Sequence, residues 1–255
     1  MCNRSTWARF SRWGVLTWAL VGAASVSAGP VFSDSTLSLA LFSSTPSYTS
    51  PGLSLINSNG GGMLQTTTPS MIGQASYGFV AGFVYAGFVY DPGSSGAINN
   101  IDFRIDRAAT TTYGGVDVPV GGLTGRALIQ QAGRLYQYIG PLTAFNPYPT
   151  LTTLTSNGLV AADFGEWDTA TNAVNFGSNP NFGGGGSMNF GFATRIGPTN
   201  PADPTIPVTM TTLAANFRLA INPAAAVPVP SSAALVLAGL LAVAATRRHR
   251  ARTRP

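Results

Sequence analysis

Hydrophobic and polar residues alternate with a period of two along much of the middle of the chain. In the clearest stretch, residues 98–107, three apolar side chains alternate with three charged ones. These are Ile101, Phe103 and Ile105 against Asp102, Arg104 and Asp106. Because successive side chains of a strand point to opposite faces, the pattern predicts a half-buried antiparallel strand with one solvated face.

Similar strand signals recur between residues 29 and 226, separated by turn residues. Residues 126–139 read as two strands joined by a hairpin turn around residues 131–133. Further strands are expected at residues 37–41, 188–196 and 213–221, and turns at residues 60–62, 91–93 and 157–158. No long segment there has the apolar spacing of 3.6 that a helix needs. The pattern predicts an all-β fold, an antiparallel β-sandwich over residues 29–226.

Two segments of this middle region have unusual compositions. Residues 81–90 are a tandem repeat, AGFVY-AGFVY, which we interpret as core strand. The alternative is an aromatic patch that stacks on a sugar or a partner protein. Residues 175–191 are rich in glycine and lack the lysine, serine and threonine placement of a phosphate loop, so a flexible surface loop is expected.

Residues 1–28 have the arrangement of a secretory signal peptide. Three arginines precede an apolar run at residues 13–26, and small residues follow it, with cleavage expected before Gly29. The single cysteine, Cys2, lies ahead of the apolar run, so the mature protein is expected to have neither a disulfide nor a thiolate metal site.

Residues 227–255 combine a Pro-x-Pro motif, an apolar run and an arginine cluster. The apolar run, residues 233–245, is short for a bilayer, but residues 227–246 supply the roughly 20 residues that a span requires. Five arginines follow at once: Arg247, Arg248, Arg250, Arg252 and Arg254. They predict a transmembrane helix with its C-terminal end in the cytoplasm, rather than a buried core helix.

This tail resembles the PEP-CTERM sorting signal. The motif is Val227, Pro228, Val229 and Pro230, with valine where the family usually has glutamate. In that family, exosortase, a membrane-embedded processing enzyme of Gram-negative bacteria, recognises the tail and removes it. The resemblance implies a membrane-anchored precursor, an exosortase-like partner, transient membrane contact, and export to the cell surface or the extracellular space.

The order of segments beyond residue 98 is similar to concanavalin/laminin-G-like jelly-roll domains. The segments are GAINNIDFRID, RALIQQAGRLYQYIG, TLTSNGLVAADFGEWD, PNFGGGGSMNFGFAT and ANFRLAI. The resemblance implies two packed antiparallel sheets and contact with carbohydrate. Trp167, Tyr136 and Tyr138 are the candidates for stacking against apolar sugar faces. The alternative is that these rings fill the sandwich core.

The charge of the chain is concentrated at its ends. Of 14 arginines, three lie in the signal peptide and five in the tail, which leaves six against nine acidic residues in the middle, a net charge of −3. The high isoelectric point therefore reflects targeting segments, and no nucleic-acid partner is expected.

The residues of common active sites are scarce. Glu166, Trp167 and Asp168 match half of the Glu-x-Asp-x-x-Glu motif of retaining glucanases, but Thr171 occupies the position of the second glutamate. The only histidine, His249, lies in the tail. We therefore predict no enzymatic activity, no cofactor and no metal site. A calcium ion held by Asp163, Asp168 and Asn172 is the alternative for metal binding.

These observations predict a non-enzymatic exported protein of the cell surface or extracellular matrix, associated with exopolysaccharide or biofilm. Two alternatives belong to other classes. One is a glucan hydrolase that uses Glu166, and the other is a purely structural surface protein without a specific ligand.

Overall fold

A computed structural model of the 255-residue chain describes residues 29–48, 54–60, 62–73, 76–118, 123–141, 150–199 and 203–224. The expected signal peptide, the motif at residues 227–230, the expected transmembrane segment and the terminal arginines lie outside these residues. Within the described ranges, no helix is long and apolar enough to cross a membrane.

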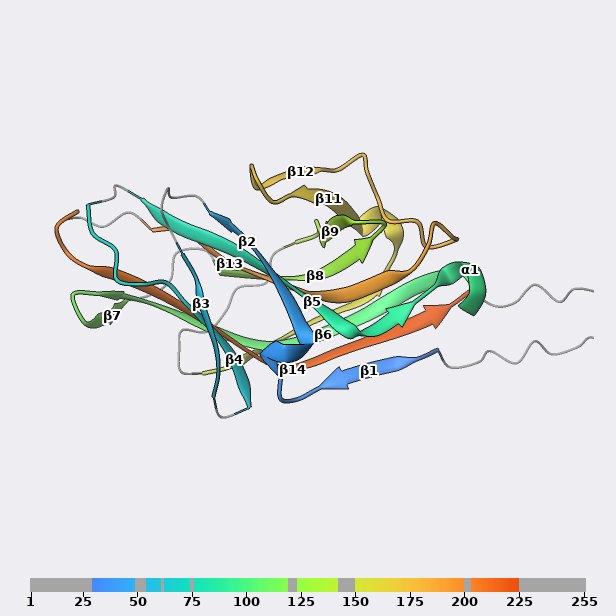
Figure 1. Cartoon of the computed structure of the whole chain (residues 1–255), viewed down its shortest axis with the longest axis horizontal. Coiled ribbons are helices and arrows are strands. Elements are labelled where there is room, and N and C mark those ends of the chain that lie inside the picture. The colour runs from blue at the N-terminus through green and yellow to red at the C-terminus, as the bar shows by residue number, and fades with distance from the viewer. Residues whose placement is uncertain are drawn as a thin grey trace, which may run out of the picture. The chain divides into compact units, whose positions relative to one another are not determined.

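The described strands form two antiparallel sheets (Figure 1). In the first, sheet A, the order is β10 (Thr152–Leu159), β6 (Ile98–Tyr113), β14 (Val208–Pro223), β4 (Met63–Thr67) and β3 (Ile56–Gly60), while β1 (Val31–Asp34) pairs with β14 and β7 (Val116–Val118) pairs with β6. In the second, sheet B, the order is β12 (Ala173–Asn175), β11 (Phe164–Asp168), β9 (Arg134–Tyr138), β8 (Leu123–Gln131), β13 (Met188–Thr199), β5 (Tyr77–Tyr90) and β2 (Phe42–Tyr48). The short helices are η1 (Leu39–Leu41), α1 (Pro92–Ser95) and η2 (Ala161–Asp163).

The two sheets pack face to face through aromatic rings, which confirms the predicted β-sandwich. Phe192 of β13 lies 5.2 Å from Phe83 of the same sheet and 5.9 Å from Phe217 of sheet A, between ring centroids. Ile101, Phe103 and Ile105 of β6 are buried in the same core, as their alternation predicts. Each such side chain contributes about 1.5–3 kcal/mol through burial, so these rows hold the layers together.

The hairpin expected at residues 126–139 is present as β8 and β9. Its two turn residues, Ala132 and Gly133, have φ angles of 51° and 77°. Positive φ at both central positions is the geometry of a type I′ turn, whose twist matches that of the flanking strands.

Two local expectations were wrong. The strand expected at residues 37–41 is replaced by a turn and η1, because the Asp34 carboxylate accepts the backbone N–H groups of Thr36 and Leu37 at 2.8 and 3.0 Å. The turn expected at residues 157–158 is a bulge inside β10, where the N–H of Gly158 donates to Asp102 across the sheet. In both cases a side-chain carboxylate redirects the backbone.

The tandem AGFVY repeat forms β5, and its two copies differ. The first copy is buried apart from the half-exposed Tyr85, as expected for core strand. In the second copy Phe88 packs on Phe32 of β1, and Tyr90 donates to the carbonyl of Gly96 at 2.7 Å. The pairing of β5 with β13 shifts register between the copies, so the two copies lie in different environments.

The glycine-rich loop after β12 is anchored to the sandwich. Gln131 is 4% exposed, and its side-chain amide donates to the carbonyls of Asn181, Gly184 and Gly186. Phe182 inserts into the core against Phe164. The flexible surface loop expected from composition is therefore held at its centre by one buried amide.

Arg107 of β6 is fully buried between the two sheets. Its Nη1 donates to the backbone carbonyl of Ala193 in β13 at 2.9 Å, and its guanidinium carbon lies 5.8 Å from the ring centre of Phe192. Burial lowers the pKa of Arg107 to about 9 because the charged form loses its hydration. A cation therefore connects sheet A to sheet B inside the core.

This burial predicts a rise of stability at alkaline pH. The folded-state pKa of Arg107 is depressed from its ordinary value to about 9, so above that pH the native state binds fewer protons than the unfolded chain. The free energy of unfolding of the wild type should rise, relative to Arg107→Met, by up to about 1.4 kcal/mol per pH unit above about pH 9. Urea titrations at two alkaline pH values measure this.

The matched control is Arg104→Met on the same strand, because the Arg104 side chain is 51% exposed. Its pH dependence should follow that of the wild type. The prediction would be contradicted if the free energy of unfolding changed with pH in the same way for the wild type and Arg107→Met.

Candidate functional site

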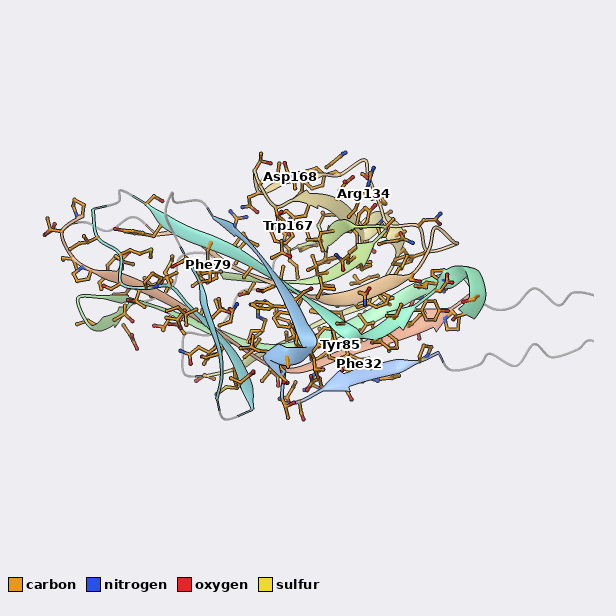
Figure 2. The ribbon with its side chains drawn as sticks, viewed as in Figure 1. Phe32, Phe79, Tyr85, Arg134, Trp167 and Asp168 are labelled. Atoms are coloured by element: carbon orange, nitrogen blue, oxygen red, sulfur yellow. The ribbon has the colours of Figure 1, made fainter. Side chains whose placement is uncertain are left out.

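The β11–β12 end of sheet B curls back over the outer face of its own sheet. In Figure 1 these strands lie above β8, β13 and β5. Trp167 of β11 fills the space between, as Figure 2 shows, whereas the neighbouring Asp168 lies on the far side of the ribbon. The Trp167 ring is 3% exposed and belongs to a second apolar cluster, separate from the main core, with Val80, Val84, Leu128 and Ala193.

One glycine makes this contact possible. A Cβ atom on Gly82 of β5 would lie 2.8 Å from Cζ3 of Trp167, closer than carbon atoms approach without displacement. The indole Nε1 of Trp167 donates to Oδ1 of Asn172 at 3.1 Å, so the polar edge of the buried ring is also satisfied. The Trp167 ring and the turn that contains Asn172 are thereby held above the sheet.

A pocket of about 260 Å³ lies beside Trp167, under the curled end. The residues that matter for its chemistry come from β5, β8, β9, β13 and the segment 172–176. They are Val80, Arg126, Gln137, Asn172, Phe176 and Arg195. The pocket is just below the roughly 300–1,000 Å³ of typical small-molecule sites, so its size suits one small unit of a larger ligand.

Phe176 forms the rim of this pocket and is 68% exposed. It also borders an open groove of about 600 Å³ lined by Glu166, Asp168 and Asn175. Phe176 is not among the predicted site residues, because the glycine-rich composition of residues 175–191 predicts a flexible loop throughout. The signal present in the sequence was an aromatic residue directly after a short strand, at Asn175-Phe176-Gly177.

The three rings predicted to stack on a sugar take part in packing within the domain. Trp167 is buried as described, and Tyr136 is 6% exposed within the main core. Tyr138 is half-buried and packs against Phe164, with 6.3 Å between ring centroids. For these three residues the structure favours the alternative, that the rings serve packing. Phe176 is the aromatic residue at this pocket whose ring is open to solvent.

The acidic residues of β11 make structural contacts. Glu166 accepts from Arg134 at 3.1 Å and from the Ser178 hydroxyl at 2.7 Å. Asp168 accepts from the Thr171 hydroxyl and the Ala170 N–H, and these hydrogen bonds lower the pKa of Asp168 below its usual range. A general acid needs a raised pKa, so Asp168 is poorly suited to protonate a glycosidic oxygen.

The residues named as alternative calcium ligands accept local hydrogen bonds. Asp163 accepts the N–H of Val160 at 2.8 Å, Asp168 holds the turn after β11, and the Asn172 oxygen accepts from Trp167. In the ranges that the structure describes, no three or more His, Cys, Asp or Glu side chains gather as metal ligands.

Comparisons of the chain with protein-family models, with curated proteins and with solved structures returned no match. The chemistry of the pocket beside Trp167 is therefore the basis for a proposed function. That pocket combines an exposed aromatic ring, two guanidinium groups and two side-chain amides on a rigid sheet face.

The contact between Trp167 and Gly82 can be tested by adding one methyl group. Gly82→Ala should lower the melting temperature, because the new Cβ meets Trp167 at 2.8 Å and Leu128 at 3.1 Å. Overpacking of this kind costs about 1–3 kcal/mol, or roughly 2–4 °C for each kcal/mol in a domain of this size. Thermal unfolding followed by circular dichroism measures the shift.

Gly60→Ala is the matched control, because nothing lies within 4 Å of a Cβ at Gly60 and its φ is not positive. Its melting temperature should equal that of the wild type. Equal melting temperatures for both variants would show that the curled end does not depend on Gly82.

Proposed function

We propose that this chain is a non-enzymatic, exported protein of the cell surface or extracellular matrix that associates with exopolysaccharide. Its domain is a jelly roll of the concanavalin/laminin-G-like kind, and it holds a glycan unit in the pocket under the curled end of sheet B. The observation that carries the proposal is the pairing, in one pocket, of the exposed Phe176 ring with guanidinium and amide groups.

A sugar ring offers an apolar face and a rim of hydroxyl groups, and this pocket has a counterpart for each. An exposed aromatic ring buries the apolar face, while Arg, Gln and Asn side chains donate to and accept from hydroxyl oxygens. Because the pocket walls come from paired strands, the polar groups are held in place before the ligand arrives, which reduces the entropy lost on binding.

Delivery of the domain follows from the two ends of the chain. The signal peptide sends it across the inner membrane, and the tail at residues 227–255 anchors the precursor through one span. An exosortase-like enzyme then cleaves near Pro228-Val229-Pro230, so that the membrane contact is transient. The presence of both signals in one chain supports this route.

The binding role is favoured over catalysis by the state of the acids near the pocket. Double displacement needs two carboxylates with different protonation states, but Glu166 is engaged by Arg134 and Ser178, and Asp168 is held ionised by Thr171. Release of soluble sugar from a β-glucan by the wild-type chain, absent in Glu166→Gln, would contradict the non-enzymatic proposal.

Glycan association predicts a specific role for Phe176. Phe176→Ala should reduce retention on an array of bacterial exopolysaccharides, since an exposed stacking ring is lost. The melting temperature should barely change, because a substitution at an exposed position usually alters stability by no more than about 0.5 kcal/mol. Trp167→Ala should instead lower the melting temperature by several degrees.

Val116→Ala is the matched control, because Val116 is 66% exposed and lies on β7 of the other sheet. It should retain the same glycans as the wild type. If Phe176→Ala and Val116→Ala bind alike, the pocket is not the glycan site.

The sorting proposal predicts the mass of the mature protein. A form released from the cell surface should begin at Gly29, end near Pro230 and lack residues 233–245. Intact-mass spectrometry decides this directly. A released form that still carries the terminal arginines would mean that the tail is a permanent anchor and no processing signal.

A further inference from the structure

The two arginines of the pocket lie diagonally opposite each other on neighbouring strands. In the pairing of β13 with β8, Ala193 is opposite Arg126 and Arg195 is opposite Thr124. Ala193 belongs to the apolar cluster under Trp167, so Arg126 and Arg195 share its outward face of the sheet. Diagonal neighbours on one face are about 7–8 Å apart, which brings two guanidinium groups within reach of one ligand group.

Neither arginine forms an ion pair with an acid among the described residues. In the described part of the chain, the ion pairs are Arg104 with Asp106 and Arg134 with Glu166. Arg126 donates one N–H to the carbonyl of Tyr138 at 2.7 Å, and Arg195 makes no hydrogen bond or ion pair with another described side chain. Burial, and secondly the nearby Arg195, lower the pKa of Arg126, as expected for a crowded cation without a counter-ion.

The two amides of the pocket add further donors. Gln137 is 6% exposed, and its side chain makes no hydrogen bond to another described residue. The Asn172 oxygen is already occupied by Trp167 Nε1, which leaves its amide nitrogen as the free group. The polar lining is therefore rich in N–H donors and holds no carboxylate, and such a lining selects a ligand that accepts hydrogen bonds.

We propose that this pocket binds the anionic group of an acidic sugar, a carboxylate or sulfate, between Arg126 and Arg195. Gln137 and Asn172 bind the neighbouring oxygens, and the ring of Phe176 covers the sugar face. The planar fork of a guanidinium matches two oxygens of either anion, which makes the site specific for charged glycan units. This inference rests on the proposed function, because it names the class of glycan that the pocket takes.

The rest of the domain argues against a general attraction for polyanions. Residues 29–226 carry six arginines against nine acids, a net charge of −3. Another surface hollow with two arginines, Arg104 and Arg218 on sheet A, also contains Asp34. Arg126 and Arg195 thus form a local cationic site on an acidic domain, and Arg218 serves as a control of equal charge.

Binding of defined polymers to the full-length chain in detergent tests the inference. The probes are polygalacturonate and its methyl ester, which differ in charge, and dextran sulfate and dextran, which differ in the same way. We expect at least one charged polymer to bind at least about tenfold more tightly than its neutral partner, since charge-assisted hydrogen bonds contribute more than neutral ones. The pair that shows the difference identifies carboxylate or sulfate as the group bound.

Arg195→Gln should reduce the affinity for the charged polymer by at least about tenfold, because half of the anion site is lost. Arg218→Gln removes the same charge from sheet A and should leave the affinity for the charged polymer within about twofold of the wild type. Arg195→Lys, which keeps the charge but loses the fork, should fall between them. It also keeps the test decisive if Arg195→Gln does not fold.

The outcomes separate the inference from the proposed function. Equal binding of charged and neutral polymers, with Arg195→Gln unchanged, would overturn the anion site while glycan association stands. Equal losses in Arg195→Gln and Arg218→Gln would reduce the effect to net charge and would also overturn it. Failure to retain any polymer, charged or neutral, here and on the exopolysaccharide array would overturn both.

Discussion

The packing of Trp167 on Gly82 is the contact that shapes the outer face of sheet B and the pocket on it. It joins β11, near one edge of sheet B, to β5, near the other, across the outer face of the strands between them. A buried tryptophan removes about 150–250 Å² from water, on the order of 4–6 kcal/mol as an upper bound. That energy offsets the bending of the sheet, and the bent end carries Asn172, Val174 and Phe176 to their places around the pocket.

Arg107 supports the same pocket from the opposite side. Its guanidinium crosses the sandwich from β6 and donates to the carbonyl of Ala193, and Ala193 lines the pocket on the outer face of sheet B. A buried cation costs several kcal/mol in lost hydration, which hydrogen bonds and the adjacent Phe192 ring offset only in part. The hydrogen bond specifies the alignment of the two sheets. A buried guanidinium has few acceptors in an apolar core, so its bond to Ala193 fixes β6 opposite β13.

The distribution of acids explains how a domain of net negative charge keeps two arginines unneutralised. All nine acidic residues between positions 29 and 226 accept hydrogen bonds within the domain, mostly from turns and neighbouring strands. These residues are Asp34, Asp91, Asp102, Asp106, Asp117, Asp163, Glu166, Asp168 and Asp203. Among the described residues they form ion pairs with Arg104 and Arg134, which leaves Arg126 and Arg195 without an acidic partner there.

Features that depend on neighbours along the chain could be predicted from the amino-acid sequence. The alternation at residues 98–107 predicted β6, and the turn residues at 131–133 predicted the β8–β9 hairpin, because side-chain direction and turn geometry are set over a few residues. Which strand faces are covered depends instead on packing between distant segments. The sequence left open whether Trp167 and Tyr136 stack on a sugar or pack inside the domain, and the fold buries both. The same fold leaves Phe176 exposed at the rim of the pocket. The pairing of Arg126 with Arg195, 69 positions apart, required the register of β8 against β13, which depends on packing between distant segments.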